Sequence, residues 1–533
     1  MSQADFRSQP ASQTSPTSEA SGSKAATSET FLDQVLGQSD SAPALETSGG
    51  KDSSSSHSLE EFLSAASVGE SLAAWLGDDW EHNAKLDSTA AVARRLSADV
   101  AVIDGLLNQQ LNAVLHHQRF QKLESSWRGL KYLTDRADQE SDPMIQVRVM
   151  TATWKELDRD FERASEFDQS HLFKKIYESE FGQAGGQPFT VLLGDYDVHP
   201  RVSREKPTDD VAILRTISGI AASAFCPFLC AASPEMLDLQ SFSELQVTRD
   251  HAERLSRTDY LKWNALRETE DARFVGMLLP RILMRGPYAD DGSRIDGFPF
   301  DEDVADPTSS DYLWGNPIYA YATVLMRAFS EGGWLADIRG LRQDEEGGGL
   351  VTDLPSLSFP TDSRDVIPRP VTEVSITDTL ERQLSDVGMV SLCDCKDTQM
   401  AVFASGQSIQ KPKQYSDLDA TANAKISAML PYIFTVSRFA HYVKVIARDK
   451  TGSVTTAKEL ETILQDWIID YVTADREAST EIKSRKPLRR AEITVNPDPG
   501  RPGSFFCVMH LSPHYELDEM VGSVRLTTRL GSG

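Results

Sequence analysis

The chain has 533 residues and an acidic excess, with 54 Lys and Arg against 80 Asp and Glu, which gives a formal charge of −26. This balance argues against a nucleic-acid binder, because affinity for phosphates comes mostly from clustered cations. The 40% of apolar residues suffices for a buried core, and the length predicts roughly two to four domains at about 150 residues each. No run approaches the ~20 apolar residues that span a bilayer, and the N-terminus lacks an apolar stretch after a basic start. Membrane insertion and signal-peptide secretion are therefore not expected.

The cysteines are too few and too irregularly spaced to form a disulfide framework. They predict a reducing compartment, most simply a cytoplasm. Neither of the close pairs has a His or Cys partner at a spacing typical of zinc sites, so we expect buried free thiols. The five positions are Cys226, Cys230, Cys393, Cys395 and Cys507.

Residues 1–57 differ in composition from the rest, being rich in Ser, Thr, Ala, Gly and Pro. Such a segment buries too little apolar surface to offset its ordering entropy, so we expect a flexible tail. Residues 30–37 are the exception, since four apolar side chains fall at helical spacing between a capping-box-like start and a glycine stop. A helix this short does not persist alone in water. It folds onto a partner, docks on its own domain, or is a chance cluster; its apolar residues are Phe31, Leu32, Val35 and Leu36.

Residues 58–140 have the pattern of a helical region. Between about 89 and 136 the apolar positions mostly step by threes and fours, which predicts a long amphipathic helical stretch. The phase changes at His116-His117, which predicts either a kink or a join between two helices. A stripe of this length commonly packs on another helix, in the same chain or in a neighbour.

Residues 141–372 alternate between strand and helix patterns, which predicts an α/β body with right-handed crossovers where strands are parallel. Residues 342–370 contain three consecutive glycines, acidic residues and prolines, and are expected to form an exposed connection. The predicted elements are a strand at 144–149, helices through 154–177, a strand at 189–193, a helix at 210–224, strands at 227–231 and 275–283, and a helix at 318–329.

Residues 373–533 are predicted to form a second α/β domain that ends in strands. Pro497-Asp-Pro-Gly500 separates two strand patterns as a turn would. The predicted elements are a helix at 376–384, strands at 389–393 and 400–403, helices at 422–448 and 456–472, and strands at 493–495 and 505–509.

No set of residues predicts an active site or a cofactor site. The glycine-rich stretch 182–186 precedes a strand and lacks a following Lys-Ser/Thr, so it does not match a phosphate-binding loop. Asp195, Asp197 and His199 lie near a strand end and have side chains that can bind a hard metal ion or act as an acid/base pair. The alternative is a polar turn, which we favour because no second cluster completes a metal site. We therefore predict no catalytic, cofactor or metal residues.

Two features near the C-terminus are compatible with contacts between copies, although each has a simpler alternative. A terminal strand pattern places Val524, Leu526, Thr528 and Leu530 on one face, and a strand at a chain end either closes its own sheet or pairs with another subunit. A basic cluster within the acidic chain is either a solvated loop or a contact with an acidic neighbour. The cluster consists of Lys483, Arg485, Lys486, Arg489 and Arg490.

Several ordered motifs resemble the large sheath subunit of bacterial type VI secretion systems, the TssC family, also called VipB, ImpC or EvpB. The likeness extends from about Leu59 to Leu530. The motifs are Leu123-Glu-Ser-Ser-Trp-Arg-Gly-Leu130, Leu193-Gly-Asp-Tyr196, Leu279-Pro-Arg281, Gly286-Pro-Tyr288, Tyr312-Leu-Trp-Gly-Asn316, Asp353-Leu-Pro355, Ala440-His-Tyr-Val-Lys444 and Ser512-Pro-His-Tyr515.

The resemblance implies a structural protein with a phage tail-sheath-like α/β fold. It implies pairing with the small subunit TssB, with residues 58–140 as the contact, and polymerisation around a tube of Hcp. It also implies contraction, baseplate contacts, recycling by the ClpV ATPase through the helix at 30–37, and strand exchange by the terminal strand. A metal-dependent hydrolase and a non-contractile sheath-like scaffold are the alternatives.

Overall fold

The computed structural model describes residues 61–77, 88–183, 185–204, 206–248, 250–290, 292, 298–304, 311–342, 346–357, 369–396, 398–450, 456–475, 478–497 and 505–514. The predicted tail helix at 30–37 and the predicted terminal strand at 524–530 lie outside the described residues. By its internal contacts the chain divides into two units, Met1–Asp99 and Val100–Gly533. None of the described helices is long and apolar enough to cross a bilayer.

In the first unit, the helix α3 (Val68–Leu76) begins with a side-chain cap. The hydroxyl of Ser67 accepts a hydrogen bond from the amide of Glu70, which satisfies one of the amides that a helix start leaves unpaired. At the other end of α3, the indole N–H of Trp75 donates to Asp99 at 3.1 Å. No side chain of α3 is buried, so within the described residues this unit has no closed core.

The predicted long helical stretch consists of two helices. α4 (Thr89–Leu115) ends two residues before the start of α5 (Gln118–Glu140). The ring of His117 caps α5 by accepting a hydrogen bond from the amide of Arg119. α5 ends at Ser141, which has a φ of 52° in the left-handed region that commonly terminates helices. The predicted break is thus a join between two helices.

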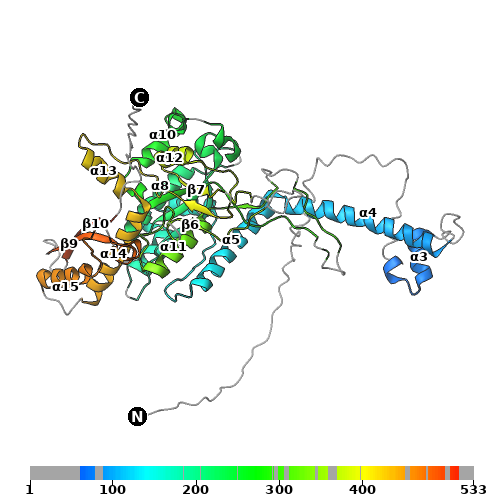
Figure 1. Cartoon of the computed structure of the whole chain (residues 1–533), viewed down its shortest axis with the longest axis horizontal. Coiled ribbons are helices and arrows are strands. Elements are labelled where there is room, and N and C mark those ends of the chain that lie inside the picture. The colour runs from blue at the N-terminus through cyan, green and yellow to red at the C-terminus, as the bar shows by residue number, and fades with distance from the viewer. Residues whose placement is uncertain are drawn as a thin grey trace, which may run out of the picture. The chain divides into compact units, whose positions relative to one another are not determined.

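A mixed six-stranded sheet organises the second unit (Figure 1). The first four strands are parallel neighbours and the last two are antiparallel additions. Parallel neighbours need crossover connections, and these are supplied by helices between consecutive strands. The predicted α/β fold class is therefore confirmed. The order is β1 (Leu192–Val198), β2 (Phe228–Ala232), β3 (Val275–Leu279), β7 (Val390–Asp394), β8 (Ala401–Phe403) and β6 (Leu350–Val351).

The sheet is buried on both faces, as its continuous apolar strands require. Cys230 and Met277 point into one core, whereas their neighbours Leu229 and Leu278 point into the other. The first core is completed by α8 (Asp210–Ala224), α10 (Leu261–Arg267) and α12 (Asp378–Asp386), and the second by α5, α11 (Ile318–Gly332) and α14 (Leu430–Asp449).

A third core lies in the C-terminal part of the second unit. Trp334 stacks on Phe439 with ring centroids 4.1 Å apart, and Leu464 and Leu488 are fully buried beside them. A two-stranded antiparallel hairpin lies over this core. The hairpin consists of β9 (Leu488–Pro497) and β10 (Phe505–Pro513), and α14 and α15 (Ala457–Ile469) also contribute to the third core. The helices α13 (Leu418–Ser427) and α16 (Thr480–Arg485) are in the same part of the chain.

The remaining elements are short and connect the longer ones. They are α6 (Trp154–Arg163), η2 (Phe167–Gln169), α7 (His171–Phe173), the π-helix η3 (Lys174–Phe181), η4 (Pro234–Leu237), η5 (Phe242–Gln246), α9 (His251–Leu255), η6 (Thr258–Tyr260), η7 (Asp271–Phe274), β4 (Ile282–Leu283) and β5 (Trp314–Gly315).

Two strand predictions and one predicted connection need correction. Residues 144–149 form no strand, since no described strand pairs with them, and Val149 is 67% exposed. The strand predicted at 189–193 forms three residues later, at Leu192–Val198. The predicted connection 342–370 is not wholly exposed, because its residues Leu350 and Val351 form β6 and are buried at the sheet edge. In each case the outcome depended on whether a described neighbouring strand pairs with the segment.

The cysteine prediction holds in part. Cys226, Cys230 and Cys393 are buried free thiols, and burial raises their pKa values. Cys395 is partly buried, but Cys507 lies on an exposed position of β10, so for this residue the prediction is wrong.

Candidate functional site

Asp195, the first of the three polar residues that the sequence analysis considers as possible ligands, lies on β1 and joins helices to the sheet. Its carboxylate accepts a hydrogen bond from the hydroxyl of Ser126 on α5. It also lies beside the phenol of Tyr319 on α11, whose pKa is raised by burial and by the charge of Asp195. The carboxylate is thus occupied in holding α5 and α11 against the sheet.

His199 lies one residue beyond β1 and faces the start of α8. Its Nδ1 is 3.2 Å from Asp210 and its Nε2 is 3.2 Å from Glu235. Asp210 also accepts hydrogen bonds from Trp154 Nε1 at 2.6 Å and Thr208 Oγ1 at 2.7 Å. Burial raises the pKa of Asp210, but these hydrogen bonds outweigh burial and hold it below its usual value. A charged carboxylate near the N-terminus of α8 also suits the helix dipole.

Asp195 and His199 therefore do not lie in one site. Asp195 contacts α5 and α11, whereas His199 contacts Asp210 at the start of α8. In the described part of the chain, no three His, Cys, Asp or Glu side chains come close enough to share a metal ion. The hydrolase alternative thus has no site among these residues.

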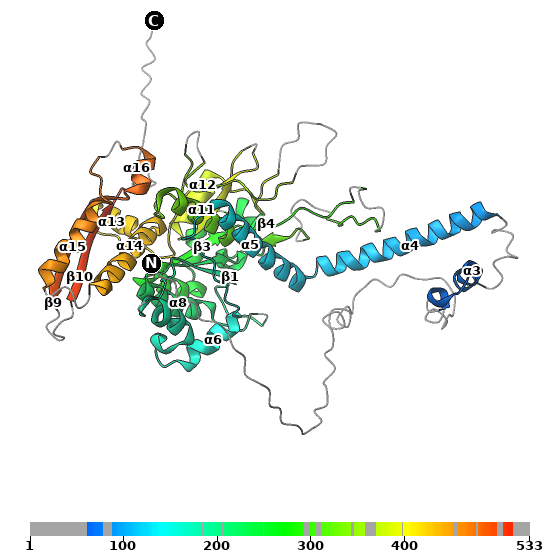
Figure 2. The same ribbon diagram turned by 90° about the horizontal axis from the view of Figure 1, so that it is seen from below.

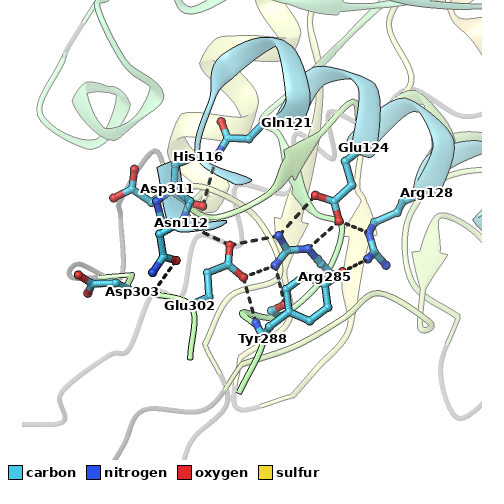
Figure 3. A network of polar contacts seen from close by, with 11 residues as sticks. Asn112, His116, Gln121, Glu124, Arg128, Arg285, Tyr288, Glu302, Asp303 and Asp311 are labelled. Carbon is cyan, nitrogen blue, oxygen red and sulfur yellow. Dashed lines mark hydrogen bonds and ion pairs between the residues drawn. The ribbon is translucent and has the colours of Figure 1, made fainter. Parts of the chain in front are cut away.

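A dense polar cluster surrounds Arg285, two residues after β4 (Figure 3). Its guanidinium donates to Glu124 of α5 at 2.8 Å and to Glu302 at 2.5 Å. The ring of Tyr288 lies over the same guanidinium, 4.2 Å away, and the amide of Tyr288 donates to Glu302 at 2.9 Å. The Arg285 and Glu302 side chains are only 8% and 1% exposed. We call Arg285, Glu124, Glu302 and Tyr288 the Arg285 cluster.

The charges in the Arg285 cluster stabilise one another. Burial opposes ionisation of both Glu124 and Arg285, but their mutual hydrogen bonds prevail. The pKa of Glu124 is therefore lowered and that of Arg285 is raised. Bidentate pairs of this kind fix geometry as well as charge. The cluster therefore holds α5 in one position relative to the segment that follows β4.

The same segment also holds the end of α4 that belongs to the second unit. Asn108 Nδ2 donates to the carbonyl of Pro299 at 3.0 Å, and Asn112 Oδ1 accepts from the amide of Asp303 at 3.1 Å. The ring of His116 lies 3.4 Å from Glu302 (Figure 3). Contacts of Asn108 and Asn112 on α4, and of His116 directly after it, therefore attach this end of the helix to the α/β body.

Sequence analysis did not identify the Arg285 cluster. Glu124 and Tyr288 lie within motifs that resemble the family, whereas Arg285 lies outside them. One feature of the sequence points to Arg285, because it directly precedes the Gly286-Pro-Tyr288 motif. Nothing in the sequence pairs Arg285 with Glu124, which is 161 positions away.

The exposed side of α4 carries an apolar surface in the second unit. Val102 is 63% exposed, Leu106 52% and Leu107 41%. Such residues at helical spacing bury their surface when a helix packs against them. The predicted amphipathic stripe is therefore partly uncovered in the isolated chain.

The C-terminal hairpin also leaves apolar and basic side chains exposed. On β10, Phe506 is 57% exposed and Val508 is 44% exposed. β10 pairs with β9 on one side, and no other described strand pairs with its second edge. Of the predicted basic cluster, Lys483 is partly buried and the others are exposed; these are Arg485, Lys486, Arg489 and Arg490.

Two family models match consecutive parts of the chain. The EvpB/VC_A0108 tail sheath N-terminal domain matches residues 97–410, and the EvpB/VC_A0108 tail sheath gpW/gp25-like domain matches residues 419–530. The type VI secretion system sheath protein TssC1 of Pseudomonas aeruginosa is 40% identical over 442 residues, which cover 82% of this chain and 86% of that protein. The cryo-EM structure of the six-fold symmetrised baseplate of the anti-feeding prophage contains a chain with 10% identity and a TM-score of 0.32, covering 71% of this chain and 82% of that one.

Proposed function

Because this chain belongs to the EvpB family of type VI secretion sheath proteins, we propose that it is the large subunit of a contractile sheath. In this proposal it pairs with the small subunit TssB, and the pairs polymerise in the cytoplasm around a tube of Hcp. The two consecutive domain matches carry the proposal, since together they account for most of the second unit.

The proposed contact with the small subunit lies within residues 58–140, on the exposed side of α4. The uncovered apolar residues of α4 support this assignment, because a partner helix would remove them from water. The Arg285 cluster and the contacts of Asn108 and Asn112 hold the base of α4 on the α/β body. Movement of the partner would therefore be transmitted to the body.

The C-terminal hairpin is the proposed site of strand exchange. The second edge of β10 offers backbone groups to an added strand, which is the usual way in which an extended segment joins a sheet. The donated strand would be residues 524–530 of a neighbouring copy, with the basic cluster at 483–490 beside it. Backbone hydrogen bonds would then link copies while contacts between their bodies change.

Contraction in this proposal needs no nucleotide bound by the chain. The free energy would be stored in contacts between subunits of the extended sheath, which attaches to a baseplate. ClpV would then recognise the segment at 30–37 and dismantle the contracted sheath.

Co-expression of the chain with its small subunit, followed by electron microscopy, tests the function. We expect tubules from the wild-type pair, and none after deletion of residues 524–530, with an unchanged melting temperature. Deletion of residues 2–8 is a control of equal length and should leave the tubules intact. Soluble monomers from the wild-type pair would contradict the sheath function, and tubules from the 524–530 deletion would contradict strand exchange.

A further inference from the structure

The outer face of α5 combines exposed apolar and basic side chains. Arg119, Leu123, Trp127 and Lys131 follow one another at intervals of four, so they line one side of the helix. Leu123 is 55% exposed and Trp127 is 65% exposed. We call these four residues, together with the exposed Lys122, the Trp127 face.

The side of α5 opposite the Trp127 face is packed firmly against the rest of the second unit. Gly129 lies so close to the ring of Tyr319 on α11 that a Cβ atom at this position would collide with it. Leu133 is 3% exposed in the second core, and Glu124 is bound by Arg285. A surface whose backbone is already ordered loses little entropy when it binds, which favours use as an interface.

The charge of the Trp127 face contrasts with that of the whole chain. Between residues 118 and 135, α5 has four cations and two carboxylates, and Glu124 is already engaged by Arg285 and Arg128. The other carboxylate, Asp135, pairs with Lys131 at 2.7 Å on the surface. Exposed Trp residues surrounded by cations are frequent centres of binding energy in interfaces. The matching surface is acidic and carries a projecting apolar side chain.

The start of α13 has this complementary chemistry. Leu418 is 83% exposed and stands between Asp417 and Asp419, with Tyr415 52% exposed beside it. We call these four residues the Leu418 knob. Asp417 caps α13 by accepting a hydrogen bond from the amide of Asp419, and Thr421 Oγ1 bonds the backbone of Tyr415 at 2.9 and 3.1 Å. The backbone of the Leu418 knob is therefore also ordered before it binds a partner.

Two lysines lie close to the Leu418 knob in the sequence. Lys413 is bound to Glu270 at 2.6 Å, and Lys425 lies at the other end of α13. Asp417 and Asp419 give the knob a negative charge, which suits a basic partner surface.

The Trp127 face and the Leu418 knob lie apart in the second unit. In both Figure 1 and Figure 2, α5 and α13 are on either side of α11. A contact between the two surfaces therefore joins different copies. Because the two surfaces differ, the contact is heterologous, and repetition of a heterologous contact produces a ring or a helix.

We propose that the Trp127 face of one copy binds the Leu418 knob of a second copy. Leu418 packs against the indole of Trp127, and Asp417 and Asp419 face Lys122 and Lys131. The proposal rests on the proposed sheath function, because the contact operates between copies in the assembled sheath.

Site-specific cross-linking tests the contact directly. Trp127→Cys and Leu418→Cys are introduced together into a chain whose exposed Cys507 is replaced by Ser, and sheaths assembled with the small subunit are treated with a short bismaleimide. We expect a ladder of linked large subunits, because each copy would carry both reactive positions. Each single-cysteine variant is the control and should give no ladder. A doubly substituted chain that assembles but stays monomeric, or links only to the small subunit or to the tube, would overturn the proposal.

Charge reversal supplies an independent test. We expect Lys122→Glu and Asp419→Lys each to lower the yield of sheaths about tenfold, and their combination to restore it to within about twofold of wild type. Lys458→Glu, which makes the same change on the exposed side of α15, is the matched control and should assemble normally. Normal assembly of both single variants, or a combination no better than either, would overturn the contact while leaving the sheath function intact. A wild-type pair that forms no sheath would contradict the proposed function, and this contact with it.

Discussion

Arg285 is a buried cation that two carboxylates from distant parts of the chain hold in place. Glu124 comes from α5 and Glu302 from the segment after β4, and both are within 2.8 Å of the guanidinium. The loss of hydration on burial offsets much of the attraction, so such clusters add more to geometry than to net stability. Removing the central cation alone is costly, because it leaves two buried carboxylates facing each other.

We therefore expect Arg285→Met to lower the free energy of unfolding by about 3 kcal/mol. Urea denaturation of the full chain measures the change. Arg485→Met is the control, because Arg485 forms an ion pair with Glu481 at 3.3 Å in which both side chains are mostly exposed. That variant should change stability by less than about 0.5 kcal/mol. A loss for Arg285→Met as small as the control would show that the cluster is not needed to hold α5.

Asp210 makes stability depend on pH through its lowered pKa. Because its folded pKa lies below the unfolded value, its stabilisation is complete above the unfolded pKa of about 4 and is lost as the pH falls through the folded pKa. We expect Asp210→Asn to cost about 2 kcal/mol at pH 7, and the difference from wild type to shrink below pH ~4.

Unfolding of both proteins across this pH range measures the effect. Asp259→Asn is the control, because Asp259 belongs to an ion pair with both side chains about half exposed. A difference between wild type and Asp210→Asn that does not vary with pH would show that the charge of Asp210 is not responsible.

At the scale of elements, α5 is the helix that connects the other parts of the second unit. One side packs on α11 so closely that only glycine fits at position 129. The same helix contributes Glu124 to the Arg285 cluster and Ser126 to the contact with Asp195. Its position is thus fixed by packing, by an ion cluster and by a hydrogen bond to the sheet.

Gly129→Ala should therefore destabilise the chain by about 1–3 kcal/mol, although alanine favours helix by about 1 kcal/mol. The matched control is Gly105→Ala on α4, where an added Cβ would meet no atom within 4 Å. There we expect unchanged or increased stability. Thermal or urea unfolding compares the two variants, and equal behaviour would contradict the close packing of α5 on α11.

At the scale of the whole molecule, the described residues show surfaces that one chain leaves uncovered. The exposed apolar residues of α4, the second edge of β10 and the Trp127 face all belong to the second unit. Exposed apolar area of this kind is a liability in a monomer and is explained by assembly. The charge of −26 helps to keep the free chain soluble before assembly.

The proposed role of the tail segment at 30–37 is in disassembly of the sheath and not in its assembly. We expect Leu36→Asp to leave tubule formation unchanged and to reduce ClpV-driven disassembly at least about tenfold, because the charge disrupts an apolar binding helix. Gln38→Asp, two residues further on, is the control. Disassembly rates followed by light scattering test this, and normal disassembly of Leu36→Asp would remove the segment at 30–37 from the ClpV interaction.

The sequence by itself determined the family, the α/β class and most of the helices. These properties reside in local periodicity and in ordered motifs, which need no knowledge of what packs where. The sequence also predicted an interruption before α5, since the apolar phase changes at His116-His117, and the structure shows that it is a join between two helices.

Only the tertiary structure decided which patterns became strands and which polar residues met. Residues 144–149 alternate like a strand but find no neighbour to pair with, whereas Leu350 and Val351 lie in an apparent loop and pair with β8. Asp195 and His199 are close in sequence yet serve different contacts, while Arg285 and Glu124 are far apart and share a hydrogen bond. Strand pairing, burial and charge pairing depend on surfaces brought together from distant positions, and local sequence carries no record of which surfaces those are.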